Sequence, residues 1–308
     1  MIDITLLGTA ALAPIPERAL TAAVLSCAGH SILFDCGEGT QTAARRAGVS
    51  LMKTDLIALT HYHGDHIFGL PGLLQTMSVM SRTEPLYITG PEGLMEELEP
   101  ILRLTGRTCF DILLVQLPPE GIALHTLAKG WPEAARLTPF ATEHRVPSQG
   151  YAFTLDRAGR FDPDRARALG VPTRQWGLLQ RGESVWAGER DVRPEDVMGP
   201  PRKGLKFAFT GDTTVCDSLI DGVRGADLLI CEATYGQDEQ APMANEYGHM
   251  CFSQAAGIAK AADVRRLWLA HYSQMIEDPA EYLPNAMAIF PDAECGEDGK
   301  RITLRYET

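Results

Sequence analysis

The amino-acid sequence predicts one α/β domain built from stacked layers of strands and helices. The chain has 308 residues, 45% of them hydrophobic, which suffices for one large core. Short apolar runs that suit buried strands alternate with helical stretches, and this alternation is typical of layered α/β domains. The helical stretches are expected at residues 38–47, 70–81, 93–104, 217–222 and 253–262. Periodicity alone does not fix the order of the layers.

The N-terminal part begins with an apolar run, residues 2–7, that suits a first strand. It lacks a basic region followed by an apolar stretch, so no signal peptide is expected. No apolar run reaches the roughly eighteen residues typical of a membrane-spanning helix, so we expect no span. The seven cysteines are scattered and odd in number, which favours free thiols in a reducing cytoplasm.

The most informative motif follows the short apolar run at residues 55–60, which suits a buried strand. His61, His63, Asp65 and His66 come directly after it, where the strand turns into a helix. Imidazole nitrogens and carboxylate oxygens are common zinc ligands. The two histidines at 61 and 63 can reach one metal ion, and the pair at 65 and 66 can reach a second. The alternative is a polar loop in which the histidines are incidental.

Two metal ions need more ligands than this motif supplies, roughly seven to nine counting water. Three further side chains follow probable strands: His144, Asp212 and His271. Taken singly, a histidine after a strand is more often a loop or core residue than a ligand. As a set that follows the motif, these three predict the missing ligands.

In this order along the chain, the motifs resemble those of the metallo-β-lactamase superfamily and, within it, of the ribonuclease Z family. The resemblance covers nearly the whole sequence, and the matching segments are residues 6–9, 34–41, 61–74, 209–213, 231–234 and 270–271. It implies a four-layer αββα sandwich with the metals at one edge of two sheets. It further implies a single domain over residues 1–308, with an inserted arm at residues 156–190 that projects and grips transfer RNA.

The resemblance also assigns ligands for two zinc ions per subunit, and manganese suits the same donors. The ligands of one ion would be His61, His63 and His144. The ligands of the other would be Asp65, His66 and His271. Asp212 and a hydroxide would bridge the ions, which in such hydrolases lie about 3.5–4 Å apart.

Further side chains are expected to support the chemistry. Asp65 could take the proton of the bridging water. By resemblance, His249 would protonate the leaving ribose oxygen and Glu232 would orient it, because an alkoxide is a poor leaving group. Asp35 would accept a hydrogen bond from the second ring nitrogen of a metal-bound histidine. The alternatives are a loop histidine near a helix N-terminus for residue 249 and a turn former for residue 35. The family commonly has threonine where Cys251 stands.

The charge distribution bears on RNA as a substrate. The net charge of −12 counts against general nucleic-acid binding, which relies on Lys and Arg. Residues 157–206, however, contain eleven basic and seven acidic residues, which favours a contact zone there. Arginine suits bidentate phosphate contacts, and those expected to bind substrate are Arg160, Arg165, Arg167 and Arg174. The alternative is a solvated insertion of mixed charge.

The expected arm has few sequence signals of its own. Asp162 or Asp164 could cap a short helix that Gly170 ends. The arm departs from the family pattern at residues 173–177, where the usual Gly-Pro is absent. Trp176 in this stretch either contacts RNA or packs the arm, and we expect packing.

Three functions are compatible with these observations. The first is a metal-dependent endoribonuclease that cuts precursor transfer RNA 3′ of the acceptor stem, leaves a 3′-hydroxyl and acts as a cytoplasmic homodimer. The second is a dinuclear hydrolase of a small phosphodiester, a cyclic nucleotide or an aryl sulfate. The third is a metal-binding scaffold without activity, which the intact motifs argue against. A true β-lactamase would have no evident use for His249.

Overall fold

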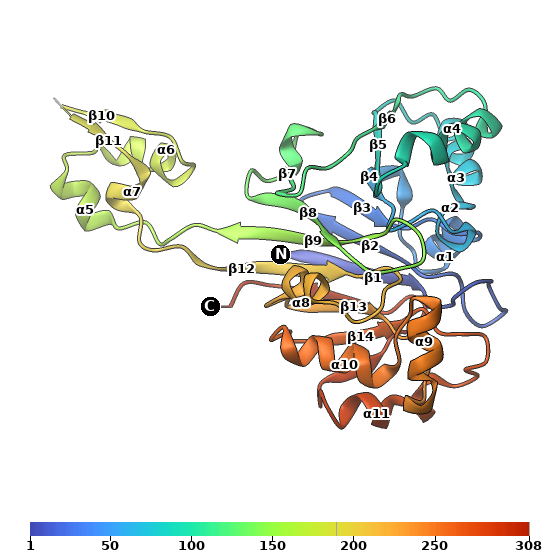
Figure 1. Ribbon diagram of the computed structural model, residues 1–308. Coiled ribbons are helices and arrows are strands. Elements are labelled where there is room, and N and C mark those ends of the chain that lie inside the picture. Colours follow the sequence, from blue (N-terminus) through green and yellow to red (C-terminus); the bar gives the residue numbers. More distant parts are fainter. Residues whose placement is uncertain (189, 308) are drawn as a thin grey trace. The chain divides into compact units, whose positions relative to one another are not determined.

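The structure, a computed structural model, describes residues 1–188 and 190–307. It divides into two compact units (Figure 1). The first unit comprises Met1–Thr154 and Leu205–Arg305. The second comprises Leu155–Gly204 and the end of the chain from Tyr306. Among the described residues, no helix combines the length and apolar character needed to cross a membrane.

The first unit contains two seven-stranded sheets. The strand order of one is β16-β1-β2-β3-β4-β5-β6. Its strands are β1 (Ile2–Gly8), β2 (Ala22–Cys27), β3 (His30–Phe34), β4 (Thr54–Ala58), β5 (Leu86–Thr89), β6 (Ile112–Leu114) and β16 (Arg301–Leu304). Strands β3 to β6 run parallel, so their carboxyl ends meet at one edge of the sheet.

The strand order of the other sheet is β15-β14-β13-β12-β9-β8-β7. Its strands are β7 (Ile122–Ala123), β8 (Ala135–Ala141), β9 (Gln149–Arg157), β12 (Arg202–Phe209), β13 (Leu228–Glu232), β14 (Leu267–Ala270) and β15 (Ala293–Cys295). Strands β12 to β15 are parallel, so this sheet also gathers several carboxyl ends at one edge.

Aromatic side chains fill the space between the two sheets. The ring of Phe34, on β3, lies 5.4 Å from that of Phe207 and 5.6 Å from that of Phe209, both on β12. It also lies 6.0 Å from the ring of Tyr151 on β9. All four side chains are buried, so burial of aromatic area holds the sheets face to face.

Helices cover the outer face of each sheet (Figure 1). The first sheet packs against α1 (Thr40–Arg46), α3 (Leu70–Val79) and α4 (Leu94–Thr105). The second packs against α8 (Asp217–Val223), α10 (Phe252–Ala261) and α11 (Leu283–Met287). The expected four-layer αββα sandwich is therefore confirmed, and each of the five expected helices is present within two residues of its predicted ends.

Shorter helices complete this unit. They are η1 (Leu51–Lys53), α2 (Gly64–Ile67), η2 (Leu124–Thr126), η4 (Asp238–Gln240), α9 (Ala241–Tyr247) and η5 (Pro279–Glu281). Helices α2 and α9 matter most here, because the segments around them carry side chains that the sequence predicts to be functional.

The second unit has a small core of its own. Its elements are α5 (Pro163–Ala168), η3 (Thr173–Gln175), α6 (Trp176–Gln180), β10 (Val185–Ala187), β11 (Arg190–Val192) and α7 (Pro194–Val197). Asp162 caps α5, because its carboxylate accepts hydrogen bonds from the amides of Asp164 and Arg165 at 3.0 Å. Val192 and Val197 pack in this core, so the unit continues beyond residue 190, where the expected insertion ends.

Trp176 packs within the second unit. Its indole Nε1 donates to the carbonyl of Val171 at 3.1 Å, and its ring lies 5.2 Å from that of Phe161. The guanidinium of Arg167 covers the ring at 5.3 Å. Of the two interpretations of this tryptophan, these contacts support packing.

We predict that Trp176→Ala destabilises the second unit by about 2 kcal/mol, since the lost ring is only partly buried. The change is measured as faster amide hydrogen exchange at residues 155–204 of the full chain. Trp186→Ala is the matched control, because that side chain is 65% exposed. Equal exchange in the two variants would contradict the assignment of Trp176 to the core.

Candidate metal centre

The seven predicted ligands all follow strands of the two sheets. His61 and His63 lie in the loop after β4. This loop leads into α2, which contains Asp65 and His66. The other three follow β8, β12 and β14, and they are His144, Asp212 and His271. The structure brings all seven to one place at the edge shared by the sheets, four of them in one group and three in a second. Asp212 and His271 also form a third group with His249.

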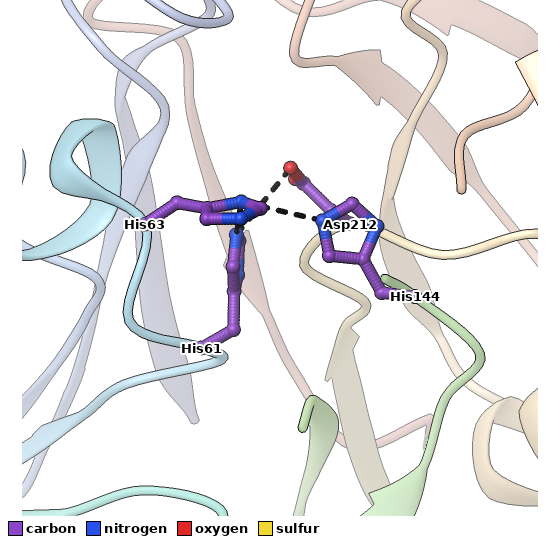
Figure 2. A group of neighbouring side chains, drawn as sticks. All are labelled: His61, His63, His144 and Asp212. Carbon is purple, nitrogen blue, oxygen red and sulfur yellow. Dashed lines mark hydrogen bonds and ion pairs between the residues drawn. The ribbon is translucent and has the colours of Figure 1, made fainter. Parts of the chain in front are cut away.

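The first group is His61, His63, His144 and Asp212, whose ligand atoms all lie within 4.8 Å of one another. Figure 2 shows the four side chains pointing toward a common point. The Nε2 atom of His61 lies 2.9 Å from His63 Nδ1 and 3.6 Å from Asp212 Oδ2. His144 Nε2 lies 3.3 Å from His63 Nδ1.

The second group is Asp65, His66 and His271. The Nε2 atoms of both histidines face the same carboxylate oxygen, Asp65 Oδ2, at 3.5 and 3.6 Å. They also face Oδ1 of Asp212, at 3.5 Å from His66 and 3.2 Å from His271. Asp212 thus presents one oxygen to each group.

The donor atoms of this centre fit metal ions. His66 Nε2, His271 Nε2 and Asp212 Oδ1 are buried and have no hydrogen-bond partner in the described part of the chain. A buried polar atom without a partner costs about 1–3 kcal/mol, so three of them converging on one space call for a cation. Imidazole and carboxylate donors suit zinc, and also manganese or iron.

The charge states of His61, His144 and Asp212 favour coordination as well. At His66 burial opposes the charge, but the carboxylates of Asp212, Asp35 and Asp65 outweigh it and raise the pKa well above its usual value. Burial, together with the charge of His66, lowers the pKa of His61 well below its usual value, so its imidazole is neutral and offers a lone pair. Burial likewise lowers the pKa of His144. Burial opposes the charge of Asp212, but His271 and His66 outweigh it and hold its pKa well below the usual value. Asp212 is therefore a carboxylate.

Asp35, at the end of β3, lies directly behind His66. Its Oδ2 accepts from His66 Nδ1 at 2.8 Å and from the Thr60 hydroxyl at 2.9 Å, and its Oδ1 accepts from the Thr60 amide at 2.7 Å. The residue is fully buried with a φ of 57°, a conformation that costs energy outside glycine. Three hydrogen bonds hold it there.

Two threonines, neither singled out from the sequence, connect buried carboxylates to the histidines. Thr60 lies between Asp35 Oδ2 and His61 Nδ1, at 2.9 and 3.1 Å. A hydroxyl has one proton, which it gives to the carboxylate, so it accepts the Nδ1–H of His61. Nε2 of that ring is then free to bind a metal. The sequence signal that could have indicated this role is the position of Thr60 directly before the predicted ligand His61.

Thr234 makes the same connection in the other sheet. Its hydroxyl lies 3.0 Å from Glu232 Oε2 and 3.0 Å from His271 Nδ1. By the same argument it donates to Glu232 and accepts from His271, whose Nε2 then faces the centre. Its amide also donates to Glu232 Oε2 at 3.0 Å.

The other oxygen of Glu232 contacts His249, which lies between α9 and α10. Oε1 is 3.0 Å from His249 Nδ1 and accepts from the Met250 amide at 3.1 Å. Burial opposes a charge on His249, but the Glu232 carboxylate outweighs it and raises the pKa of His249 to about 9. The imidazole is therefore protonated at neutral pH, and it lines a cavity of roughly 730 Å³ together with His63 and His144.

The four arginines expected to bind substrate all lie in the second unit, not in the metal centre. Arg165 pairs with Asp162 at 3.4 Å, and Arg167 pairs with Asp164 at 2.7 Å. Arg160 lines a separate cavity of roughly 450 Å³, and Arg174 is exposed.

The chain is similar to known proteins in both sequence and fold. A family model described as "Beta-lactamase superfamily domain" matches residues 181–272, and one described as "Anti-Pycsar protein Apyc1" matches residues 2–111. Ribonuclease Z of Lachnoclostridium phytofermentans is 39% identical over all of this chain and 99% of its own. Ribonuclease Z of Clostridium tetani is 40% identical over the whole of both chains. The crystal structure of human tRNase Z, short form, is 28% identical, with a TM-score of 0.69 over 99% of this chain and 100% of that one.

We predict that Thr234→Val weakens metal binding at the second group about 10- to 100-fold, because His271 loses its hydrogen-bond acceptor. Thr60→Val is expected to act on the first group in the same way, through His61. Metal content per chain is measured after dialysis against graded chelator. Thr234→Ser, which keeps the hydroxyl, should restore binding.

Thr54→Val is the control for these variants, because Thr54 is equally buried but lies at the start of β4. Metal retention by Thr234→Val equal to that of the control would contradict the role of the hydroxyl.

Proposed function

The chain belongs to the ribonuclease Z family, and we propose that it cleaves precursor transfer RNA 3′ of the acceptor stem and leaves a 3′-hydroxyl. It is a metal-dependent hydrolase of the metallo-β-lactamase fold. The observation that carries the proposal is the meeting of two ligand groups at Asp212 beside the Glu232–His249 pair. Both groups and His249 contribute side chains to the wall of one cavity.

Seven side chains would hold the metal pair, which we propose to be zinc, with manganese as the other suitable ion. One ion would lie among His61, His63 and His144, the other among Asp65, His66 and His271, with Asp212 between them. When bound, such a pair lowers the pKa of a water molecule and neutralises charge on phosphoryl oxygens.

Asp65 is proposed to orient the attacking water and to accept its proton. Its Oδ2 accepts a hydrogen bond from the amide of Leu12 at 2.9 Å, which fixes the carboxylate at the wall of the cavity. Asp35 and Thr60 keep His66 and His61 in the orientation that directs Nε2 toward the centre. Asp35 and Thr60 are therefore proposed to position the two rings.

His249 is proposed as the general acid. It is protonated at neutral pH, it faces the cavity, and the carboxylate of Glu232 fixes its ring at 3.0 Å. It would give its proton to the ribose oxygen that leaves, since an alkoxide departs slowly without one. Glu232 would act as its orienting carboxylate.

A hydrolase of a small phosphodiester, a cyclic nucleotide or an aryl sulfate is the second candidate. Two of the arginines expected to bind RNA, Arg165 and Arg167, form ion pairs within their own unit. Their charge is partly neutralised there, which favours a substrate that does not need them. These pairs are exposed and therefore weak, so we rank this candidate second.

Assembly and location are further parts of the proposal. By the family resemblance we propose a homodimer in which the second unit grips RNA. All seven cysteines are free, which supports a reducing compartment such as the cytoplasm.

The direct test of the function is an assay of the purified protein on precursor transfer RNA, with and without chelator, that maps the cut. A single chelator-sensitive cut 3′ of the acceptor stem is expected. Hydrolysis of bis(p-nitrophenyl) phosphate without any RNA cleavage would favour the second candidate.

We predict that His249→Ala slows cleavage of precursor transfer RNA by roughly 10²–10⁴-fold, because the leaving alkoxide loses its proton donor. Loss on a p-nitrophenyl ester should be much smaller, because that leaving group needs little protonation. Turnover of both substrates is measured alongside metal content. Loss of metal from the variant would instead make His249 a ligand.

Replacing residues 161–198 by a short glycine linker should abolish cleavage of precursor transfer RNA while hydrolysis of the small phosphodiester continues. A short linker can join the two ends, because they already lie side by side: the amide of Gly199 donates to the carbonyl of Arg160 at 2.7 Å. Both activities are measured on the same preparation. Undiminished RNA cleavage would show that the second unit does not grip the substrate.

A further inference from the structure

One arginine is singled out by its place beside the metal centre. The cavity that contains His63, His144 and His249 adjoins a second cavity, of roughly 850 Å³. The two share the segment of His144, Arg145 and Val146. Among the described residues that line either cavity, Arg145 is the only lysine or arginine. A strand that passes from one cavity to the other would cross it.

The side chain of Arg145 is exposed, and no carboxylate of the described residues pairs with its charge. Within residues 1–188 and 190–307 it forms no ion pair with a carboxylate, unlike Arg165 and Arg167. Its guanidinium instead lies 5.8 Å from the ring centre of Tyr247, which is 44% exposed and lines the same cavity.

Neighbouring contacts hold this pair at the reacting centre. His144 Nδ1 donates to the carbonyl of Gly248 at 2.8 Å, which ties the segment of Arg145 to that of Tyr247. Gly248 has a φ of 81°, and a Cβ there would come within 2.5 Å of His144 Nδ1. Only glycine allows this approach, so the place of the pair beside His144 and His249 is built into the backbone.

We propose that Arg145 and Tyr247 form a nucleotide-binding subsite that holds the RNA residue next to the cleaved bond. The guanidinium contacts the phosphate adjacent to the scissile one, a contact that its planar donors can make in bidentate form. The exposed ring of Tyr247 stacks on the neighbouring base, as aromatic side chains do in single-stranded nucleic-acid sites. The inference rests on the proposed function and deepens it, because it identifies the part of the substrate that the centre itself recognises.

The test compares Arg145→Gln with Arg107→Gln on precursor transfer RNA. Arg107 is also exposed and lines neither cavity, so the control removes the same charge elsewhere. Arg145→Gln is expected to raise KM about 10- to 100-fold with a smaller effect on kcat, since a charged hydrogen bond to bound substrate is lost. The slope of log KM against log salt concentration should fall by about 0.7, the value for one phosphate contact on a single strand. Arg145→Lys should recover part of the loss.

Tyr247 is tested by a pair of substitutions. Tyr247→Leu should raise KM roughly tenfold, whereas Tyr247→Phe keeps the stacking face and should behave as the unmodified protein. Metal content is measured in every variant, and a value equal to that of the unmodified protein shows that the centre is intact.

Equal KM values and salt slopes for Arg145→Gln and Arg107→Gln would overturn the subsite. Equal KM values for Tyr247→Leu and Tyr247→Phe would overturn the stacking. Both outcomes leave RNA cleavage by the unmodified protein in place and so differ from failure of the proposed function. That failure would appear as no chelator-sensitive cleavage of precursor transfer RNA by the unmodified protein.

Discussion

The carboxylate of Asp212 is the group on which the rest of the site depends. It is buried, and its two oxygens face different sets of histidines, with Oδ2 toward His61 and Oδ1 toward His66 and His271. A buried carboxylate is costly unless opposite charge compensates it. The need for compensating positive charge explains why strand ends from both sheets bring histidines to Asp212. A bound cation would also compensate the buried donor atoms that lack hydrogen-bond partners.

Each sheet supplies one further buried carboxylate that orients the ligands. Asp35 ends β3, contacts His66 directly and reaches His61 through a threonine hydroxyl. Glu232 ends β13 and contacts His249, and it reaches His271 through a second threonine hydroxyl. The two halves of the sandwich thus repeat one solution: a carboxylate, a threonine and an imidazole whose Nε2 faces the centre. Glu232 holds both the ring of His271, through Thr234, and the ring of His249, which is the proposed proton donor.

The sequence could predict which side chains gather at the centre, because histidine and aspartate in such a tight cluster have no ordinary packing role. Helix positions followed from apolar spacing, whereas the layer order required the family resemblance. Thr234 and Tyr247 could not be assigned, because their partners His271 and Arg145 are distant in sequence and meet only in the folded chain. The excess of basic residues in the expected arm also did not show that Arg165 and Arg167 each pair with a carboxylate three residues earlier in the chain.

The most direct test of the account is anomalous diffraction at the zinc absorption edge, on crystals of the full chain grown with zinc. Two peaks per chain are expected, one on either side of Asp212. One is expected among the imidazoles of His61, His63 and His144, and the other beside His66 and His271. A single peak, or peaks that leave Asp212 uncoordinated, would contradict the claim that its carboxylate joins two metal sites.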